Sequence, residues 1–532
     1  MGGAIELLSP PSSPVPGRPS FAPRTRYRPS LTTVGWILLY AATFLFYQHQ
    51  LRTAGPSGTT STSLLSLSAN AGSSLATTSC EVCHLDPSNP LCEYGLDNIR
   101  TSRAYEGSGA RLGRVLQRAL AGEEIGVGVI GASVTQGHGV PQGKQRWEDR
   151  WFDDFKTLFP KAKMHVGAVP ATDSRFFSYC FEAVVPRDLD LYLVELDVNN
   201  APGPQTLRDD DALMRGLLQL PQEPAVVRVS AFTTIFNELA RGAISSLITS
   251  QFFDVPVIGV RNFLLPQVIR HRETAEELFG LDQGGNRDYR HIGHVSHAAM
   301  ADMLSLFVRK EVCETQRRAA LPPAPAFEKS GPWPGEADLG KVPELALWSS
   351  WLSPEPLVPV TPMCQSTMCP LSPLQVLSHS PTFEFVTWND KHAWTSSTPG
   401  AQIRMKFRGT KVGVFVYASN GRGANEVSAD VAVRKVEAPG QALCWIEEPD
   451  MTEDEWREKY GVGDDVEEEK EGPAAAQTWI VTTHMPNKPA PQPEFIEMAE
   501  GLDVGEHVLA CEVSKETTSG GHKWRIMGIA SQ

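Results

Sequence analysis

This 532-residue sequence contains a serine, a histidine and an aspartate that could together form an activated serine nucleophile, although the serine lies far from the other two along the chain. Ser133 follows a glycine and an alanine, which are small enough to let the backbone turn sharply and expose a hydroxyl. A serine hydroxyl becomes nucleophilic when an imidazole accepts its proton and a carboxylate holds that imidazole in place. Asp288 and His291 stand three residues apart on an expected loop, so a local turn can bring them together. Taken singly, these features also fit a tight turn and a capping Asp beside a surface His.

Asn199 is a fourth candidate, because it belongs to the segment Glu-Leu-Asp-Val-Asn-Asn at the end of an apolar run. A side-chain amide at a strand end can donate to the oxyanion that develops on an ester carbonyl oxygen. An ordinary Asn-Asn turn would explain the same residues. His294 and His297 are rivals for the base, and His138 stands near the expected pocket mouth. No carboxylate or cysteine spacing accompanies these histidines, so neither a metal nor a cofactor is expected.

The elements that must position these residues follow from an alternation of short apolar runs and helical patterns. Apolar runs at 125–130, 164–166, 189–196, 225–230 and 255–260 predict the strands of a mostly parallel sheet. Two apolar stripes with helical spacing lie between and after them, and we interpret both as core: Trp147, Trp151, Phe155 and Leu158, and Met300, Met303, Leu304, Phe307 and Val308. The pattern predicts a three-layer α/β/α domain, whose ligands bind beyond the carboxyl ends of the strands.

The order of these motifs resembles that of the SGNH (GDSL-like) hydrolase superfamily. Its blocks correspond here to Gly131-Ala132-Ser133, to Val198-Asn199-Asn200 and to Asp288-Tyr289-Arg290-His291, within residues 95–312. The resemblance implies that Ser133 is the nucleophile, that His291 is the general base and then the general acid, and that Asp288 orients His291. It also implies an oxyanion hole formed by the backbone N–H groups of Ser133 and Ala171 and the side-chain amide of Asn199.

The sequence departs from the family pattern at several positions. Ala132 replaces the usual Asp before the nucleophile, and Ala171 stands where the family has a glycine. Asp197 and Asn200 replace the outer Gly and Asp of the third block. An alanine keeps its N–H group, so Ala171 can still donate unless the site needs a positive φ. His297 fits a position at the start of a helix that the family often fills with histidine.

A period-two pattern follows a Pro-rich linker at 314–375 and predicts an antiparallel β-sandwich over 376–532. Its expected strands lie at 402–407, 411–417, 428–434, 478–483, 507–513 and 523–529. Trp388 and Trp394 are candidates for stacking on a sugar, although core packing would explain them too. The arrangement resembles that of eukaryotic, membrane-anchored SGNH proteins associated with polysaccharides, which carry a C-terminal β-sandwich.

Residues 31–49 contain a run without formal charge that is close to the roughly 20 residues needed to span a bilayer. Four arginines precede it, and only Arg52 follows closely, so the positive-inside rule places residues 1–30 in the cytosol. Residues 50–79 are rich in Ser and Thr and suit a flexible stem, which leads to the hydrolase-like domain at 80–313. A cleaved signal peptide ending at Ala69-Asn70-Ala71 is the alternative, although that site lies far beyond the apolar run.

All nine cysteines follow this segment, where an oxidising compartment would favour disulfides and leave at least one thiol unpaired. The net charge is −14, and residues 447–471 alone contribute −10, from thirteen acidic and three basic side chains. This run is interpreted as a solvated insertion, and no basic stripe for nucleic acid is present.

We therefore expect a single-pass type II membrane protein of the Golgi or another secretory-pathway membrane, with a lumenal or extracellular serine esterase that removes O-acetyl groups from a glycan. An O-acyltransferase that uses the same Ser-His-Asp site and a non-catalytic glycan-binding or scaffold protein are the alternatives. The identity of the sugar and of the acyl group, the disulfide pairing and the oligomeric state stay open at this point.

Overall fold

The computed structural model describes residues 79–532 except 237–242, 321–331, 333–334, 336–337, 355–356, 358–361, 389, 421–437, 448–477 and 488–490. The predicted tail (1–30), the signal-anchor (31–49), nearly all of the stem (50–79), the expected strand at 428–434 and most of the acidic run lie outside the described residues. Among the helices that are described, none combines the length and the apolar character needed to cross a membrane.

A six-stranded sheet forms the centre of the first domain, in the order β1-β6-β5-β4-β2-β3. Its strands are β1 (Arg103–Tyr105), β2 (Gly126–Gly131), β3 (Lys163–Ala168), β4 (Leu191–Glu195), β5 (Ala225–Ser230) and β6 (Val257–Gly259). β2 to β6 are parallel to one another, and the short β1 pairs with β6 in the antiparallel direction. The five runs predicted as strands are therefore all present, whereas β1 was not expected.

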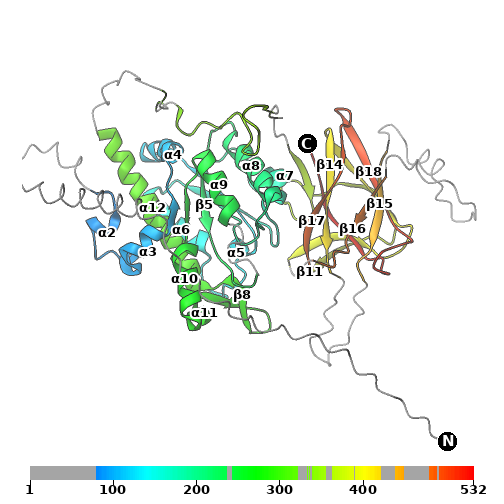
Figure 1. The fold of residues 1–532 in the computed structure, drawn as a ribbon, viewed down its shortest axis with the longest axis horizontal. Coiled ribbons are helices and arrows are strands. Elements are labelled where there is room, and N and C mark those ends of the chain that lie inside the picture. Colours follow the sequence, from blue (N-terminus) through cyan, green and yellow to red (C-terminus); the bar gives the residue numbers. More distant parts are fainter. Residues whose placement is uncertain are drawn as a thin grey trace, which may run out of the picture. The chain divides into compact units, whose positions relative to one another are not determined.

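Helices cover both faces of this sheet (Figure 1). α4 (Ala110–Leu120), α6 (Trp147–Leu158) and α12 (His294–Ala320) contribute to one apolar core, and α7 (Ser174–Val184), α8 (Pro204–Leu218) and α9 (Ala243–Phe253) contribute to the other. The shorter helices are α2 (Val82–Leu85), η1 (Pro90–Tyr94), α3 (Leu96–Thr101), α5 (Ser133–Gln136), α10 (Arg261–Arg270), η2 (Arg272–Thr274) and α11 (Ala275–Leu278).

Strand β4 shows how the sheet separates the two cores. Leu191 and Leu193 belong to the core formed with α6 and α12, whereas Tyr192 and Val194 belong to the core formed with α7 and α8. Successive side chains of a strand point to opposite faces, so a strand buried on both faces is apolar at every position. This arrangement confirms the predicted three-layer α/β/α domain.

Residues 288–291, which were expected on a loop, lie on a strand. β7 (Phe279–Leu281) and β8 (Arg287–Ile292) form a two-stranded antiparallel sheet of their own. Its register changes abruptly, because Phe279 pairs with Ile292 while the next residue, Gly280, pairs with Asp288. Residues 289–291 therefore bulge out of the ladder, and a bulge re-aims side chains that a regular strand would send to alternate faces. The prediction of a loop at 288–291 was therefore wrong, although the bulge brings Asp288 and His291 together as a loop would.

The second domain consists of two antiparallel sheets, drawn in yellow to red in Figure 1. One sheet has the order β10-β13-β18-β15-β16, and the other has the order β11-β12-β19-β14-β17, with β9 added to β19. The strands are β9 (Met363–Ser366), β10 (Val376–His379), β11 (Glu384–Trp388), β12 (Lys391–Ser396), β13 (Gln402–Arg408), β14 (Lys411–Ala418), β15 (Gln441–Glu447), β16 (Thr478–Thr482), β17 (Gln492–Glu500), β18 (Glu506–Val513) and β19 (Trp524–Ser531). Alternate residues such as Ile403, Met405 and Phe407 form the core of this domain.

Two segments at the edge of the predicted linker, 314–375, belong to regular elements instead. α12 continues to Ala320, and Met363–Ser366 forms β9, which pairs with β19 of the sandwich. The side chain of Cys364 on β9 is buried against α7. An amphipathic stretch as short as four residues gives little signal of a strand when prolines precede it.

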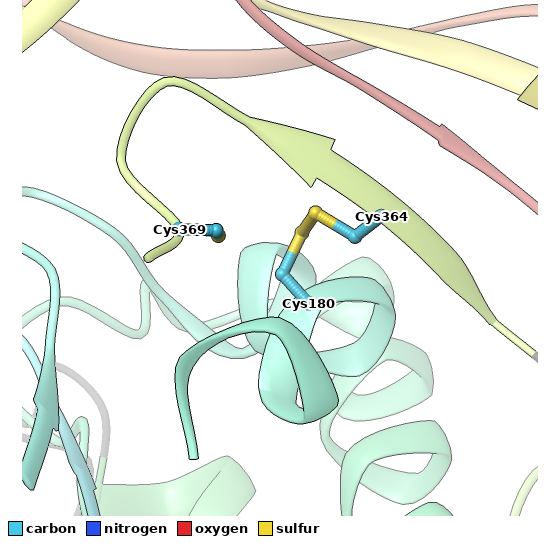
Figure 2. Close-up of side chains that lie close together, drawn as sticks. All are labelled: Cys180, Cys364 and Cys369. Atoms are coloured by element: carbon cyan, nitrogen blue, oxygen red, sulfur yellow. A yellow bond between two sulfur atoms is a disulfide. The ribbon is translucent and has the colours of Figure 1, made fainter. Parts of the chain in front are cut away.

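Helix α7 is joined covalently to the second domain. Figure 2 shows the disulfide between Cys180 on α7 and Cys364 on β9, with the thiol of Cys369 close to both. Cys369 is the one free cysteine, and burial raises the pKa of its thiol to about 12. The remaining disulfides are Cys80–Cys313, Cys83–Cys92 and Cys444–Cys511. The expectation that nine cysteines leave at least one thiol unpaired is confirmed.

Candidate active site

Ser133 is the first residue of α5 and comes two residues after the end of β2. The chain turns sharply here, and Gly131 makes the turn possible. A Cβ atom on Gly131 would collide with the side chain of Thr135, so a close approach excludes any larger residue. Ser133 is consequently presented at the carboxyl end of a central parallel strand, which is where ligands bind in such sheets.

His291 connects the hydroxyl of Ser133 to the carboxylate of Asp288. Its Nε2 atom lies 2.9 Å from Ser133 Oγ, and its Nδ1 atom lies 2.5 Å from Asp288 Oδ2. The carboxylate accepts the Nδ1 proton, so Nε2 is left as the acceptor of the serine proton. The bulge in β8 therefore brings together the three groups that the sequence had suggested as a nucleophile, a base and an orienting acid.

Asp288 is held in its charged form by its surroundings. Burial alone would raise its pKa, but the hydrogen bond and the charge of His291, together with the backbone N–H of Arg290, outweigh burial and lower it. The Arg290 N–H donates to Asp288 Oδ1 at 2.9 Å, which fixes the carboxylate within its own turn. An ionised Asp288 is the form that can stabilise an imidazolium on His291.

The three groups expected to form the oxyanion hole, at Ser133, Ala171 and Asn199, line one cavity with His291. Ala171 has a φ of +64°, so the site does use the left-handed conformation that favours glycine. An L-residue in this conformation costs roughly 1–2 kcal/mol, but its N–H group is retained. Neighbouring Thr172 closes the turn by donating from Oγ1 to the carbonyl of Val169 at 2.6 Å.

Asp197 and Asn200, the two departures in the third block, are buried supports. Asn200 Nδ2 donates to Ser174 Oγ at 2.7 Å, and its Oδ1 accepts from the Ser174 N–H at 3.0 Å. The carboxylate of Asp197 accepts a hydrogen bond from the hydroxyl of Ser230. These bonds attach the loop after β4 to the start of α7 and to the end of β5, while Asn199 between them faces the cavity.

His138, His294 and His297, the other candidate histidines among the described residues, are not hydrogen-bonded to Ser133. His297 is fully buried, its Nδ1 accepts from the Trp147 N–H at 3.1 Å, and burial lowers its pKa to about 3. His294 is exposed at the start of α12. His138 lines the cavity with its ring edge-on to His291, at 5.2 Å between centroids. Burial and the charges of His291 and Lys391 lower the pKa of His138 to about 4, so it is neutral at physiological pH.

Glu195, at the end of β4, is a buried carboxyl group that sequence reasoning overlooked. Thr135, two residues after the nucleophile, donates from Oγ1 to Glu195 Oε2 at 3.0 Å. Burial raises the pKa of Glu195 to about 8, so the group is protonated over most of the neutral range. Its one sequence signal was an acidic residue at the end of a run that is otherwise apolar.

The cavity above Ser133 has a volume of about 240 Å³, and the second domain forms part of its wall. Lys391, Tyr417 and the segment 491–493 line it opposite the residues of the catalytic loops. Because these residues lie more than 250 positions after Ser133 and carry no motif, no sequence pattern connects them with the site.

The two tryptophans considered for sugar stacking contact protein groups. The guanidinium of Arg525 lies over the ring of Trp388 at 5.0 Å, and Tyr417 meets that ring edge-on at 5.1 Å. Trp394 packs beside His379 and Phe385, at 4.6 and 5.8 Å between centroids. Packing therefore accounts for the position of both rings.

Comparison with known proteins shows that this chain is similar in structure to a solved esterase. No family model matches the chain, and no curated protein matches its sequence. A two-domain esterase (CEX) active on acetylated mannans aligns with 81% of this chain and 98% of its own, at 17% identity and a TM-score of 0.53. The same esterase co-crystallised with mannopentaose gives a TM-score of 0.52. An acetyl xylan esterase, AlAXEase, aligns with 34% of this chain at a TM-score of 0.27, which is too low to support an argument. The similarity to CEX extends over both domains and establishes a shared two-domain fold.

Proposed function

We propose that this chain, which has the two-domain fold of SGNH esterases, is a serine ester hydrolase that removes O-acetyl groups from a glycan. One observation carries the proposal: Ser133, His291 and Asp288 form a hydrogen-bonded series at the carboxyl ends of parallel strands. The series opens into a cavity that Ala171 and Asn199 also line. A hydroxyl, a base and an orienting carboxylate in this order are suited to acyl transfer.

In the first half of the reaction, Ser133 Oγ attacks the carbonyl carbon of the acetyl group while His291 Nε2 accepts the serine proton. The carbonyl oxygen becomes an oxyanion, which the N–H groups of Ser133 and Ala171 and the amide of Asn199 stabilise. One such donor is worth about 3 kcal/mol of the activation free energy. His291 then returns the proton to the departing sugar oxygen, which leaves an acetyl ester on Ser133.

In the second half, a water molecule attacks the acetyl carbonyl while His291 accepts one of its protons. Collapse of the second tetrahedral intermediate releases acetate, and Ser133 recovers its proton from His291. Asp288 remains ionised throughout and stabilises the imidazolium in both halves. Neutral His138 beside the base adds no second positive charge to the site.

The glycan part of the proposal has a separate support. CEX, whose two-domain fold this chain shares, is described as active on acetylated mannans. Both domains line the cavity of this chain, so each of them can contact a substrate that is larger than an aryl ester. A small acyl group attached to a sugar suits a cavity of about 240 Å³.

The test is hydrolysis of an aryl acetate and of an O-acetylated oligosaccharide by the purified full-length chain. Ser133→Ala and His291→Ala should each lower kcat by at least about 10⁴-fold, because the nucleophile and its base act as one unit. The matched control is His294→Ala, which removes an exposed histidine three residues from the base and should retain activity. Retained activity in Ser133→Ala would contradict the proposal and favour the scaffold alternative. Transfer of the acetyl group to an added sugar hydroxyl instead of water would favour the acyltransferase.

We also propose that the site faces the lumen of the secretory pathway or the extracellular space, behind an N-terminal signal-anchor at 31–49. Four disulfides between described cysteines support an oxidising compartment, since such bonds are rare in the cytosol. Digestion of intact membrane vesicles by a protease should leave the domains protected and remove a tag on residue 1. Digestion of the domains in intact vesicles would contradict this orientation.

A further inference from the structure

Two cationic side chains line the cavity beside the catalytic base. Arg290 belongs to the bulge of β8, between the orienting acid and His291. Lys391 is the first residue of β12 in the second domain. Both line the cavity that contains Ser133 and Asn199, so positive charge reaches the reacting ester from both domains.

Within the described part of the chain, neither cation takes part in an ion pair at 4.0 Å or less, although the charge of Asp288 acts on Arg290 and that of Asp390 acts on Lys391. Asp288 is occupied by His291 and by backbone, and Asp173 accepts from the N–H groups of α7 that it caps. Asp390 is adjacent to Lys391 in sequence, and its charge opposes but does not outweigh the lowering of the Lys391 pKa by burial.

Burial makes the absence of an ion-pair partner unfavourable for both Arg290 and Lys391. The Nε atom of Arg290 is buried without a hydrogen-bond partner. Burial, and after it the charge of Arg290, lower the pKa of Lys391. Buried charges are unfavourable unless an opposite charge pairs with them, so this pair of cations is suited to an anion that arrives with the substrate. His138 is neutral and cannot supply or compensate charge here.

We propose that Arg290 and Lys391 bind a carboxylate that the substrate carries close to the scissile ester, so that acidic acylated glycans are preferred over neutral ones. A guanidinium binds a carboxylate through two parallel N–H groups, and an ammonium adds a point charge. The inference rests on the proposed esterase function and specifies its substrate class. The carboxylate can belong to a uronic acid ring or to the acyl group itself, as in a succinyl half-ester.

The experiment uses the full-length chain and three substrates that differ at one group each: mono-O-acetylated methyl glucuronoside, mono-O-acetylated methyl glucoside and mono-O-succinylated methyl glucoside. We expect kcat/KM for an acidic substrate to exceed that for the neutral acetyl glucoside by about 10-fold or more, as a charge-assisted contact does. A preference for the glucuronoside assigns the carboxylate to the sugar, and a preference for the succinyl ester assigns it to the acyl group.

The variants Lys391→Met and Arg290→Met should each reduce this preference ratio about 10-fold, and added salt should reduce it in the wild type. Lys515→Met and Arg100→Gln, which remove exposed cations outside the cavity, are the matched controls and should leave the ratio unchanged. Equal kcat/KM on the acidic and neutral substrates would overturn the inference while the esterase function stands. A preference that persists in both cavity variants would overturn it as well.

A binding measurement separates this inference from a failure of the proposed function. If the chain hydrolyses no ester, methyl glucuronoside and methyl glucoside are titrated into the same full-length protein by calorimetry. Binding of the glucuronoside that Lys391→Met weakens supports the carboxylate site, and equal or absent binding of the two sugars overturns it.

Discussion

The carboxyl group of Glu195 accepts a hydrogen bond from the turn that presents the nucleophile, and it does so from a fully buried position. Thr135 Oγ1 is the donor, and the second carboxyl oxygen has no hydrogen-bond partner among the described residues. An uncharged carboxyl group tolerates this environment far better than a carboxylate. The protonation state of Glu195 therefore couples the geometry around Ser133 to pH.

The pKa of folded Glu195 is raised to about 8, above the ordinary value of 4.5 that applies when the chain is unfolded. The folded state consequently binds an extra proton between these values, and its stability falls as the pH rises through this interval, by up to about 1.4 kcal/mol per pH unit. Below pH 4.5 this contribution is fully present. Glu195→Gln should flatten the slope of the free energy of unfolding between pH 5 and 8, measured by urea denaturation.

The matched control for this prediction is Glu277→Gln, which neutralises an exposed carboxylate on α11. Its slope should equal that of the wild type. Equal slopes in Glu195→Gln and the wild type would show that the buried carboxyl group has no role in the pH dependence.

At the scale of single residues, the sequence predicted the side chains that form motifs. Ser133 and Asn199 reach one cavity, because a parallel sheet brings the ends of its strands to one edge. His291 reaches the same cavity from the bulge of β8, and Asp288 is hydrogen-bonded to His291 without lining the cavity. The positive φ of Ala171 was not predicted, because an alanine in the sequence does not indicate which backbone conformation it adopts. Lys391 was missed, because no local pattern connects a lysine of the sandwich to a distant serine.

At the scale of elements, prediction succeeded for the five parallel strands of the first domain and missed several strands of the sandwich. The sheet strands of the first domain are continuous apolar runs, which are easy to recognise. In the sandwich, β10, β11 and β17 carry exposed or half-buried residues along most of their length and were not predicted. β12 and β15 were not predicted either, although β15 is mostly buried. β7 and β8 were missed because a three-residue strand and a bulged strand have no clean period.

Helix α7 and strand β9 provide the prediction at this scale. Their disulfide, Cys180–Cys364, closes a separation of 184 residues, whereas Cys83–Cys92 closes one of 9. In the chain-entropy model the longer loop contributes about 5 kcal/mol and the shorter one about 3 kcal/mol. The double variant Cys180→Ala/Cys364→Ala should therefore lose more free energy of unfolding in urea than Cys83→Ala/Cys92→Ala. An equal or smaller loss would indicate that packing alone joins α7 to β9.

At the scale of the whole molecule, one apolar core is shared by the two domains. It contains Phe176 and Phe181 of α7 together with Phe415 of β14, and the rings of Phe176 and Phe415 lie 5.0 Å apart. Val414 and Val416 on either side of Phe415 belong to the core of the sandwich. The alternation along β14 thus assigns one face of the strand to its own domain and the other to the catalytic domain.

This shared core predicts cooperative unfolding of both domains. Phe415 is 2% exposed, so Phe415→Ala should cost about 3–5 kcal/mol of stability. Hydrogen–deuterium exchange should show loss of protection in β13 of the sandwich and in β4 of the catalytic domain together. The control, Phe385→Ala, removes a ring that is 53% exposed and should cost less than about 1 kcal/mol. Loss of protection in the sandwich alone would contradict cooperative unfolding.

The position of α7 between two cores has a consequence for how such a protein can change over evolution. Helix α7 presents aromatic rings and a cysteine to the second domain, so substitutions in the second domain have to remain compatible with α7. Replacement of the second domain by an unrelated module would expose the apolar face of α7 and the thiol of Cys180 to solvent, which favours aggregation. The two halves are therefore expected to diverge as a single inherited block, with compensating substitutions on either side of α7.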